Sequence, residues 1–85
     1  MEKFEVGKTY EAIRGYNYHF PVTVVRKTDK TVTFKLGDEM QRYFNFGPEV
    51  RRRCKVVNDI ESATLSGNCA HSYDNWVVYS NCVTQ

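Results

Sequence analysis

The most reactive side chains in this sequence are three cysteines and one histidine in its second half. They are Cys54, Cys69, His71 and Cys82. Three thiolates and one imidazole are a known ligand set for structural zinc. Zinc sites of this kind usually contain two cysteines separated by about two to four residues, whereas here only Cys69 and His71 are close, with one residue between them. The spacing therefore favours free thiols over a zinc site, and we expect no cofactor.

Nucleophilic chemistry has weak support in the same region. Cys69 and His71 could form a thiol–imidazole pair, but no third group that would orient the imidazole is evident. Ser66, Ser72 and Asp74 supply the other residue types of a hydrolase triad, without a nucleophile-elbow motif. We therefore predict no catalytic residues and a protein that is not an enzyme. A zinc- or thiol-dependent site at the three cysteines and His71 remains an alternative.

Positive charge is the second chemical feature, and it is concentrated in the middle of the chain. Residues 26–55 contain nine Lys and Arg against four Asp and Glu, which gives this segment a charge of +5. The last thirty residues contain no Lys or Arg and carry a charge of −3. The whole chain has a formal charge of only +2. If the fold keeps the two regions apart, the molecule has an electrostatic dipole.

The run Arg51–Arg53 indicates on which side of a strand part of this positive charge lies. Alternate residues of a β-strand point to the same side, so Arg51 and Arg53 point together and Lys55 lies in line with them. The predicted basic face also includes residues of the neighbouring strands, and its members are Lys35, Arg42, Arg51, Arg53 and Lys55.

Such a face could bind the phosphates of nucleic acid, with Tyr43 or Tyr79 stacking on bases, or it could bind an acidic protein surface. The alternative is an outer face that only keeps the protein in solution, with arginines paired to Asp and Glu.

A cluster of rings precedes the most strand-like part of the chain. Tyr16, Tyr18 and His19, followed by Phe20, predict an aromatic loop. Loops of this kind at one end of a small barrel can line a shallow groove for peptides or nucleotides. They can equally close the end of the barrel and complete the core.

The elements that would position these side chains are β-strands. Residues 20–36 predict a hairpin, because β-branched and aromatic residues alternate with polar ones on both sides of a polar turn at 27–30. Strands are also predicted at 9–14, 40–46, 50–57 and 76–83, a strand or a short helical turn at 60–65, and a loop at 67–75.

The predicted fold class is all-β: a small antiparallel barrel, SH3-like, with five to seven short strands and little helix. Its 85 residues form a single domain. The polar start of the sequence lacks the apolar region of a secretory signal. No apolar run approaches the ~20 residues that a membrane span needs. We therefore expect a cytoplasmic protein with no membrane partner.

Three segments resemble a group of known proteins. They are Val6–Tyr10 (VGKTY), Val24–Phe34 (VVRKTDKTVTF) and Arg51–Arg53. In these segments the chain resembles small, mostly uncharacterised β-rich proteins encoded on phages and other mobile elements of Gram-positive gut bacteria. The resemblance covers about residues 4–57 and implies a phage or mobile-element origin, without assigning any catalytic residue.

Together these observations predict a non-enzymatic binding module. Its basic face would bind nucleic acid or an acidic protein surface. The alternative is an inhibitor of a host defence protein, which the phage resemblance and the presence of Tyr and Trp on short loops would suit.

Overall fold

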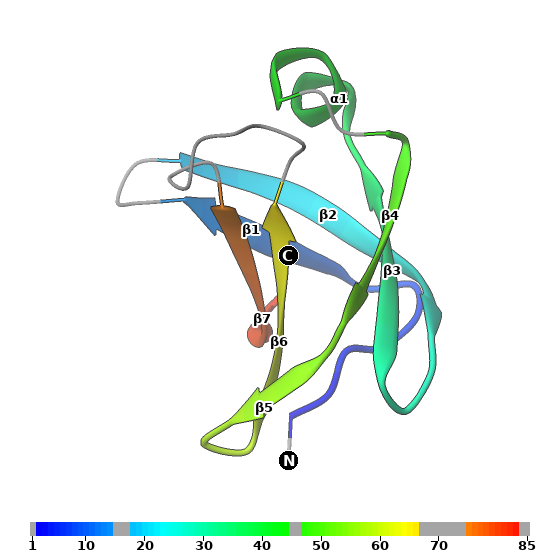
Figure 1. Cartoon of the computed structure of the whole chain (residues 1–85), viewed down its shortest axis with the longest axis vertical. Coiled ribbons are helices and arrows are strands. Elements are labelled where there is room, and N and C mark those ends of the chain that lie inside the picture. The colour runs from blue at the N-terminus through cyan, green and yellow to red at the C-terminus, as the bar shows by residue number, and fades with distance from the viewer. Residues whose placement is uncertain (1, 15–17, 45–46, 67–74, 84–85) are drawn as a thin grey trace.

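The computed structural model describes residues 2–14, 18–44, 47–66 and 75–83, which form seven strands and one short helix (Figure 1). In chain order the elements are β1 (Thr9–Arg14), β2 (Tyr18–Lys27), β3 (Thr31–Leu36), α1 (Asp38–Phe44), β4 (Glu49–Arg53), β5 (Lys55–Val57), β6 (Ile60–Ser66) and β7 (Asn75–Val83).

The predicted hairpin is confirmed as β2 and β3, which pair antiparallel. Their inward residues are Val22 and Val24 on β2, and Val32, Phe34 and Leu36 on β3, and all five are buried. The turn between the strands is held by Thr28, whose Oγ1 accepts the backbone N–H of Thr31 at 3.0 Å. The alternation of apolar and polar residues along the sequence therefore corresponds to a buried face and an outward face of the hairpin.

The strands form a ring in which neighbours in sequence are neighbours in space. The sheet order is β4-β3-β2-β1-β7-β6-β5, and every pairing is antiparallel. β4 and β5, at the two ends of this order, are separated only by Cys54. One bent stretch of chain thus pairs with β3 before Cys54 and with β6 after it, which nearly closes the sheet into a small antiparallel barrel.

This architecture confirms the predicted fold class, while its SH3-like subtype stays a prediction. Residues 60–65, for which a strand or a short helical turn was expected, lie in strand β6. The predicted strand at 76–83 is confirmed as β7. Of the loop expected at 67–75, residues 67–74 lie outside the described part of the chain, and Asn75 is already the first residue of β7.

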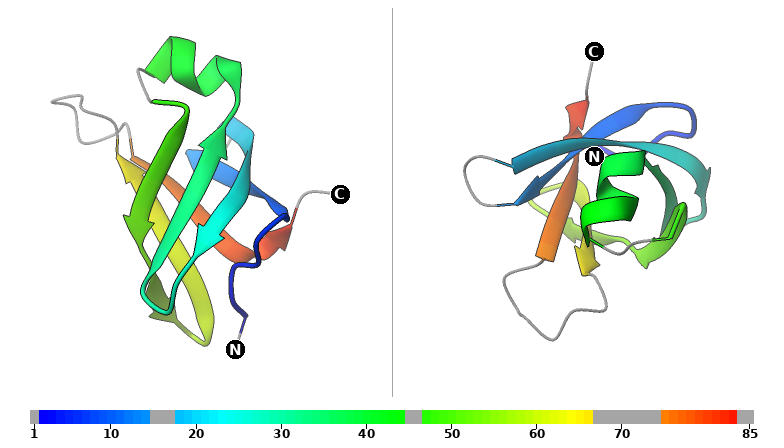
Figure 2. Two further views of the ribbon diagram at one scale, coloured as in Figure 1. Left: turned by 90° about the vertical axis from the view of Figure 1, so that its right-hand side faces the viewer. Right: turned by 90° about the horizontal axis from the view of Figure 1, so that it is seen from above.

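The predicted strand at 40–46 is wrong, because residues 38–44 form helix α1. Asp38 and Glu39 lie in its first turn and Arg42 in its last, where their charges complement the helix dipole. The Gln41 side chain donates to the carbonyl of Leu36 at 2.9 Å and ties the helix to the end of β3. Seen from above, α1 lies over one end of the barrel (Figure 2).

The core fills the barrel with side chains from every strand except β5, whose three residues are exposed. Its largest fully buried members are Trp76, Tyr10, Phe34 and Leu65. Phe4 reaches the core from the segment before β1, and its ring packs edge-on against Tyr10 and Phe34, with centroid distances of 5.1 and 5.4 Å. Among the described residues, no helix is long and apolar enough to span a membrane.

Candidate binding face

Strand pairing decides which basic side chains share a side of the sheet. Lys35 of β3 lies opposite Glu49, and Thr33 lies opposite Arg51. Directly opposite residues of an antiparallel pair point to the same side. The buried Phe34 between Lys35 and Thr33 points inward, so these pairs face outward.

Lys35, Arg51 and Arg53 therefore share the outer side of β3 and β4, and all three are exposed. This placement agrees with the predicted basic face for these three residues.

A fourth member of this face was not predicted. The register between β2 and β3 shifts after Val24, which lies opposite Phe34, so that Arg26 lies opposite Thr33. Val25 is the extra residue of this β-bulge, and such a residue reverses the alternation of side chains beyond it. Arg26 consequently points outward. We call the outward set Arg26, Lys35, Arg51 and Arg53 the basic face.

Negative charge on the basic face is small. Glu49 is its acidic member, and its Oε1 lies 3.9 Å from Nη1 of Arg26. Both side chains are well exposed, at 47% and 75%. A long, exposed ion pair of this kind contributes little free energy. Arg26 and its three basic neighbours thus remain available to an external anion.

Two predicted members lie elsewhere. Arg42 is exposed on α1, so its predicted place on the sheet is wrong. Lys55 lies in β5, opposite Ser62, which in turn lies opposite Tyr79 of β7. The bend at Cys54 therefore moves Lys55 from the row of Arg51 and Arg53 to the wall formed by β5, β6 and β7.

The expected stacking rings are not on this face among the described side chains. Tyr79 is 41% exposed, but it belongs to the row of Lys55. The side chain of Tyr43 lies outside the described part of the chain. The described outward neighbours of the basic residues are instead threonines: Thr23 and Thr31 are half-buried, and Thr33 is buried beneath its neighbours at 7% exposure.

The expected aromatic loop is partly strand. Tyr16 lies outside the described residues, and β2 already begins at Tyr18, whose side chain is not described. His19 is outward and exposed, and its Nδ1 lies 3.4 Å from a carboxylate oxygen of Glu11. Phe20 is half-buried and packs against Trp76 with a centroid distance of 5.4 Å.

An apolar hollow adjoins the basic face. One part, of about 280 Å³, is lined by Phe20, Pro21, Gly37, Asp38 and Glu39. A second part, of about 270 Å³, shares Pro21 and Gly37 and extends to Lys35. A surface with cationic groups next to an apolar depression is suited to a partner that offers both carboxylates and apolar side chains.

The candidate zinc site is described only in part. Cys54 and Cys82 are free thiols of intermediate exposure, and Cys69 and His71 lie outside the described residues. Within the described ranges, no three His, Cys, Asp or Glu side chains are grouped as metal ligands would be. Burial raises the pKa of the Cys54 thiol, which nearby Lys27 lowers in part and Glu61 raises further. A raised pKa makes Cys54 a poor nucleophile near neutral pH.

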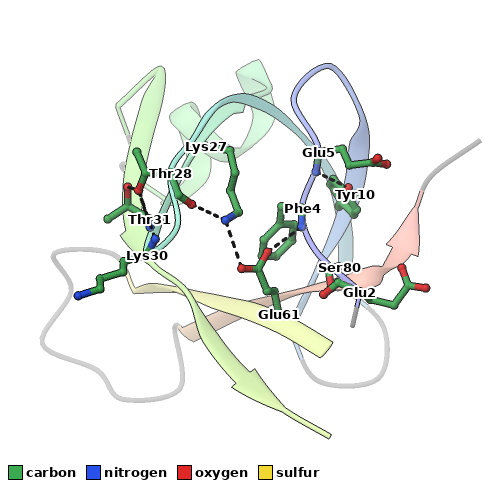
Figure 3. Close-up of polar contacts among 10 residues, drawn as sticks. All are labelled: Glu2, Phe4, Glu5, Tyr10, Lys27, Thr28, Lys30, Thr31, Glu61 and Ser80. Carbon is green, nitrogen blue, oxygen red and sulfur yellow. Dashed lines mark hydrogen bonds and ion pairs between the residues drawn. The ribbon is translucent and has the colours of Figure 1, made fainter. Parts of the chain in front are cut away.

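A buried ion pair lies at the opposite end of the barrel from α1 (Figure 3). Lys27 points inward because of the same β-bulge that turns Arg26 outward, and its Nζ lies 3.2 Å from Oε2 of Glu61. The other carboxylate oxygen of Glu61 accepts the backbone N–H of Phe4 at 2.8 Å. The Lys27 ammonium also donates to the carbonyl of Thr28 at 2.5 Å.

This pair joins the segment before β1 to the barrel. The carbonyl of Glu2 accepts the Ser80 hydroxyl at 2.9 Å and the backbone N–H of Glu61 at 3.0 Å. The side chain of Glu61 is 3% exposed and that of Lys27 is 14% exposed. This pair was not predicted, since regular alternation from Val22 and Val24 would put Lys27 on the outer side of the sheet.

Comparisons of the chain with protein-family models, with curated proteins and with solved structures found no match. The protein is therefore described by its own fold and surface: it is a small antiparallel barrel that carries a basic face and an adjoining apolar hollow.

Proposed function

We propose that this chain is a non-enzymatic binding module whose basic face contacts an acidic surface of a partner protein. One observation carries the proposal: strand register collects Arg26, Lys35, Arg51 and Arg53 on one exposed wall, with Glu49 as the acidic member. Charge complementarity of this kind steers association and selects partners.

Three features favour a protein partner over nucleic acid. Nonspecific binding of single strands relies on aromatic side chains on which bases stack, and the described side chains of the basic face include none. The hollow beside Lys35 is lined by Pro21 and Leu36, which suits an apolar side chain of a partner. Asp38 and Glu39 at its far side would repel a continuous line of phosphates.

A charge-reversal experiment tests the proposal. The variant Arg51→Glu/Arg53→Glu changes the basic face, and the control Arg42→Glu/Lys55→Glu makes the same change of net charge elsewhere on the exposed surface. Fluorescently labelled polyglutamate and a labelled single-stranded DNA oligonucleotide serve as probes at low and physiological salt. Circular dichroism checks that both variants keep the β-sheet spectrum of the unchanged protein.

We expect polyglutamate to bind the unchanged protein and the control alike, and the face variant at least about tenfold more weakly. Equal weakening by both variants would show that net charge, and not this face, drives binding. Tighter binding of DNA than of polyglutamate, lost in the face variant, would assign the face to nucleic acid instead.

An inhibitor of a host defence protein would be a special case of this function. Trp76, which was expected on a loop where it could contact the host protein, is instead fully buried in β7 and cannot make that contact. A phage or mobile-element origin stays a prediction from the resemblance of residues 6–10, 24–34 and 51–53.

A further inference from the structure

The hydrogen bonds at the two ends of β4 fix how its backbone is oriented. The N–H of Leu36 donates to the carbonyl of Pro48 at 2.9 Å, just before β4. The N–H of Cys54 donates to the carbonyl of Lys30 at 2.8 Å, just after it. In an antiparallel ladder, hydrogen-bonded pairs alternate with pairs whose backbone groups point away from each other.

The alternation of hydrogen-bonded pairs can be followed along β4 from Pro48 or from Cys54, and both starting points give the same assignment. Val50 and Arg52 direct their backbone groups toward β3. The N–H and carbonyl groups of Glu49, Arg51 and Arg53 therefore point away from β3, toward the free side of β4. These three alternate residues thus direct their backbone groups to one edge, where the carbonyl of Arg51 already accepts a hydrogen bond from the Arg52 guanidinium.

No strand among the described residues pairs with this edge. β4 is the last strand at its end of the sheet order. On the far side of the bend, β5 pairs with β6 only from Ile60 to Ser62, so that Ala63–Leu65 of β6 pair with β7 alone. β4 and β6 therefore lie next to each other without pairing as strands, on the side of β4 that faces away from β3 (Figures 1 and 2).

Basic side chains predominate along the open edge, which begins at the acidic Glu49. Arg51 and Arg53 are exposed on the outer side, and the guanidinium of Arg52 donates to the carbonyl of Arg51 at 2.8 Å. Positive charge along an edge discourages pairing with a second copy of the same edge. The same charge favours an added strand that carries carboxylates.

We infer that the acidic partner binds as an extended strand that adds to the free edge of β4. This inference rests on the proposed function and makes it more specific. Carboxylates at two alternate positions of the strand lie opposite Arg51 and Arg53, because directly opposite residues share a side of the sheet. The residue between them faces Arg52. Backbone hydrogen bonds provide affinity and the carboxylates provide specificity, as in other cases of strand addition.

A peptide pair separates strand addition from simple charge attraction. The first probe is a labelled, end-capped peptide of alternating Glu and Thr. The second has the same sequence with N-methyl groups on two successive central residues, which keeps the charge and removes donors from both edges. Fluorescence anisotropy measures both affinities for the unchanged protein, for Arg51→Glu/Arg53→Glu and for the control Arg42→Glu/Lys55→Glu. Amide hydrogen exchange by NMR follows Glu49, Arg51 and Arg53.

We expect the unmethylated peptide to bind about tenfold more tightly than the methylated one, because one of the two methylated positions faces β4, where a backbone hydrogen bond is lost and the methyl group hinders close approach. The amides of Glu49, Arg51 and Arg53 should exchange quickly in the free protein and become protected in the complex. The face variant should lose binding and the control should keep it.

Three results would overturn the inference. Equal affinity of the two peptides, with loss in the face variant, would leave the basic face as the binding site and remove strand addition. Slow exchange of the three amides in the free protein would show that the edge is already covered. Binding of neither peptide, together with no binding of polyglutamate, would remove the proposed function as well.

Discussion

The buried pair of Lys27 and Glu61 gives the sharpest stability prediction. Lys27→Met removes the ammonium and keeps an unbranched apolar stem, while Glu61→Gln keeps the shape and an oxygen that can accept the N–H of Phe4. The two substitutions are not equivalent. Without Lys27, the Glu61 carboxylate, 3% exposed, keeps only the Phe4 N–H among its described partners. Without the carboxylate, Lys27 still donates to the carbonyl of Thr28.

The magnitudes follow from this asymmetry. Leaving one charge of a buried pair unpaired costs about 3–5 kcal/mol, so Lys27→Met should reduce the free energy of unfolding by that amount. Losing a hydrogen bond to a charged group costs about 1.5–3 kcal/mol, which we expect for Glu61→Gln. The double variant should be no less stable than Lys27→Met alone, because Gln at position 61 leaves no buried charge.

Urea unfolding followed by tryptophan fluorescence measures all three variants, with Trp76 as the probe in the core. Lys8→Met is the matched control, since Lys8 pairs with Glu5 on the exposed surface, and we expect no measurable change in stability. The double-mutant cycle should give a coupling of about 1.5–3 kcal/mol between Lys27 and Glu61. Additive penalties for the two single substitutions would refute the reasoning.

Two further predictions concern the bend and the β5–β6 turn. Because burial raises the pKa of Cys54 above its ordinary value of 9.0, iodoacetamide should alkylate it more slowly in the native protein than in urea, as peptide mass spectrometry can measure. The thiol ionises first in the unfolded chain, so its contribution to stability is complete below pH 9.0 and is lost as the pH rises beyond it. Equal alkylation rates in the native and unfolded protein would contradict this burial. In the turn, Asn58 and Asp59 have φ values of 53° and 63°, as a two-residue type I′ turn requires. Asn58→Val should therefore cost about 1–2 kcal/mol, whereas Asn58→Gly should cost little. Equal urea midpoints for these two variants would be evidence against strain at this position.

The strands were predictable wherever one face of a strand is buried. Val22, Val24, Val32 and Phe34 alternate with polar residues, and the barrel buries all four. Helix α1 was missed because Tyr43-Phe44-Asn45-Phe46 also alternates as a strand would. The acidic pair Asp38 and Glu39 was the available sign of a helix start.

The binding face was only partly predictable, because one inserted residue decides it. With regular alternation from Val24, Arg26 points inward and Lys27 outward; the bulge at Val25 reverses both. Nothing in the local sequence distinguishes Val25 from Val24. The bend at Cys54 had a similar effect, since Lys55 continues the alternation of Arg51 and Arg53 but belongs to a different pair of strands.

The ring of sequential strands also has a consequence for how the chain folds. Among the described strands, all pairings join segments that follow one another, except that of β1 with β7, which spans most of the chain. Hairpins form within about 1–10 μs, while a contact between distant segments must first overcome the entropy of closing a long loop. We therefore expect the joining of β1 to β7 to be the slow, late step of folding. The hydrogen bond between Glu2 and Ser80 joins segments close to the two ends of the sequence, so we expect it to form in the same late stage of folding.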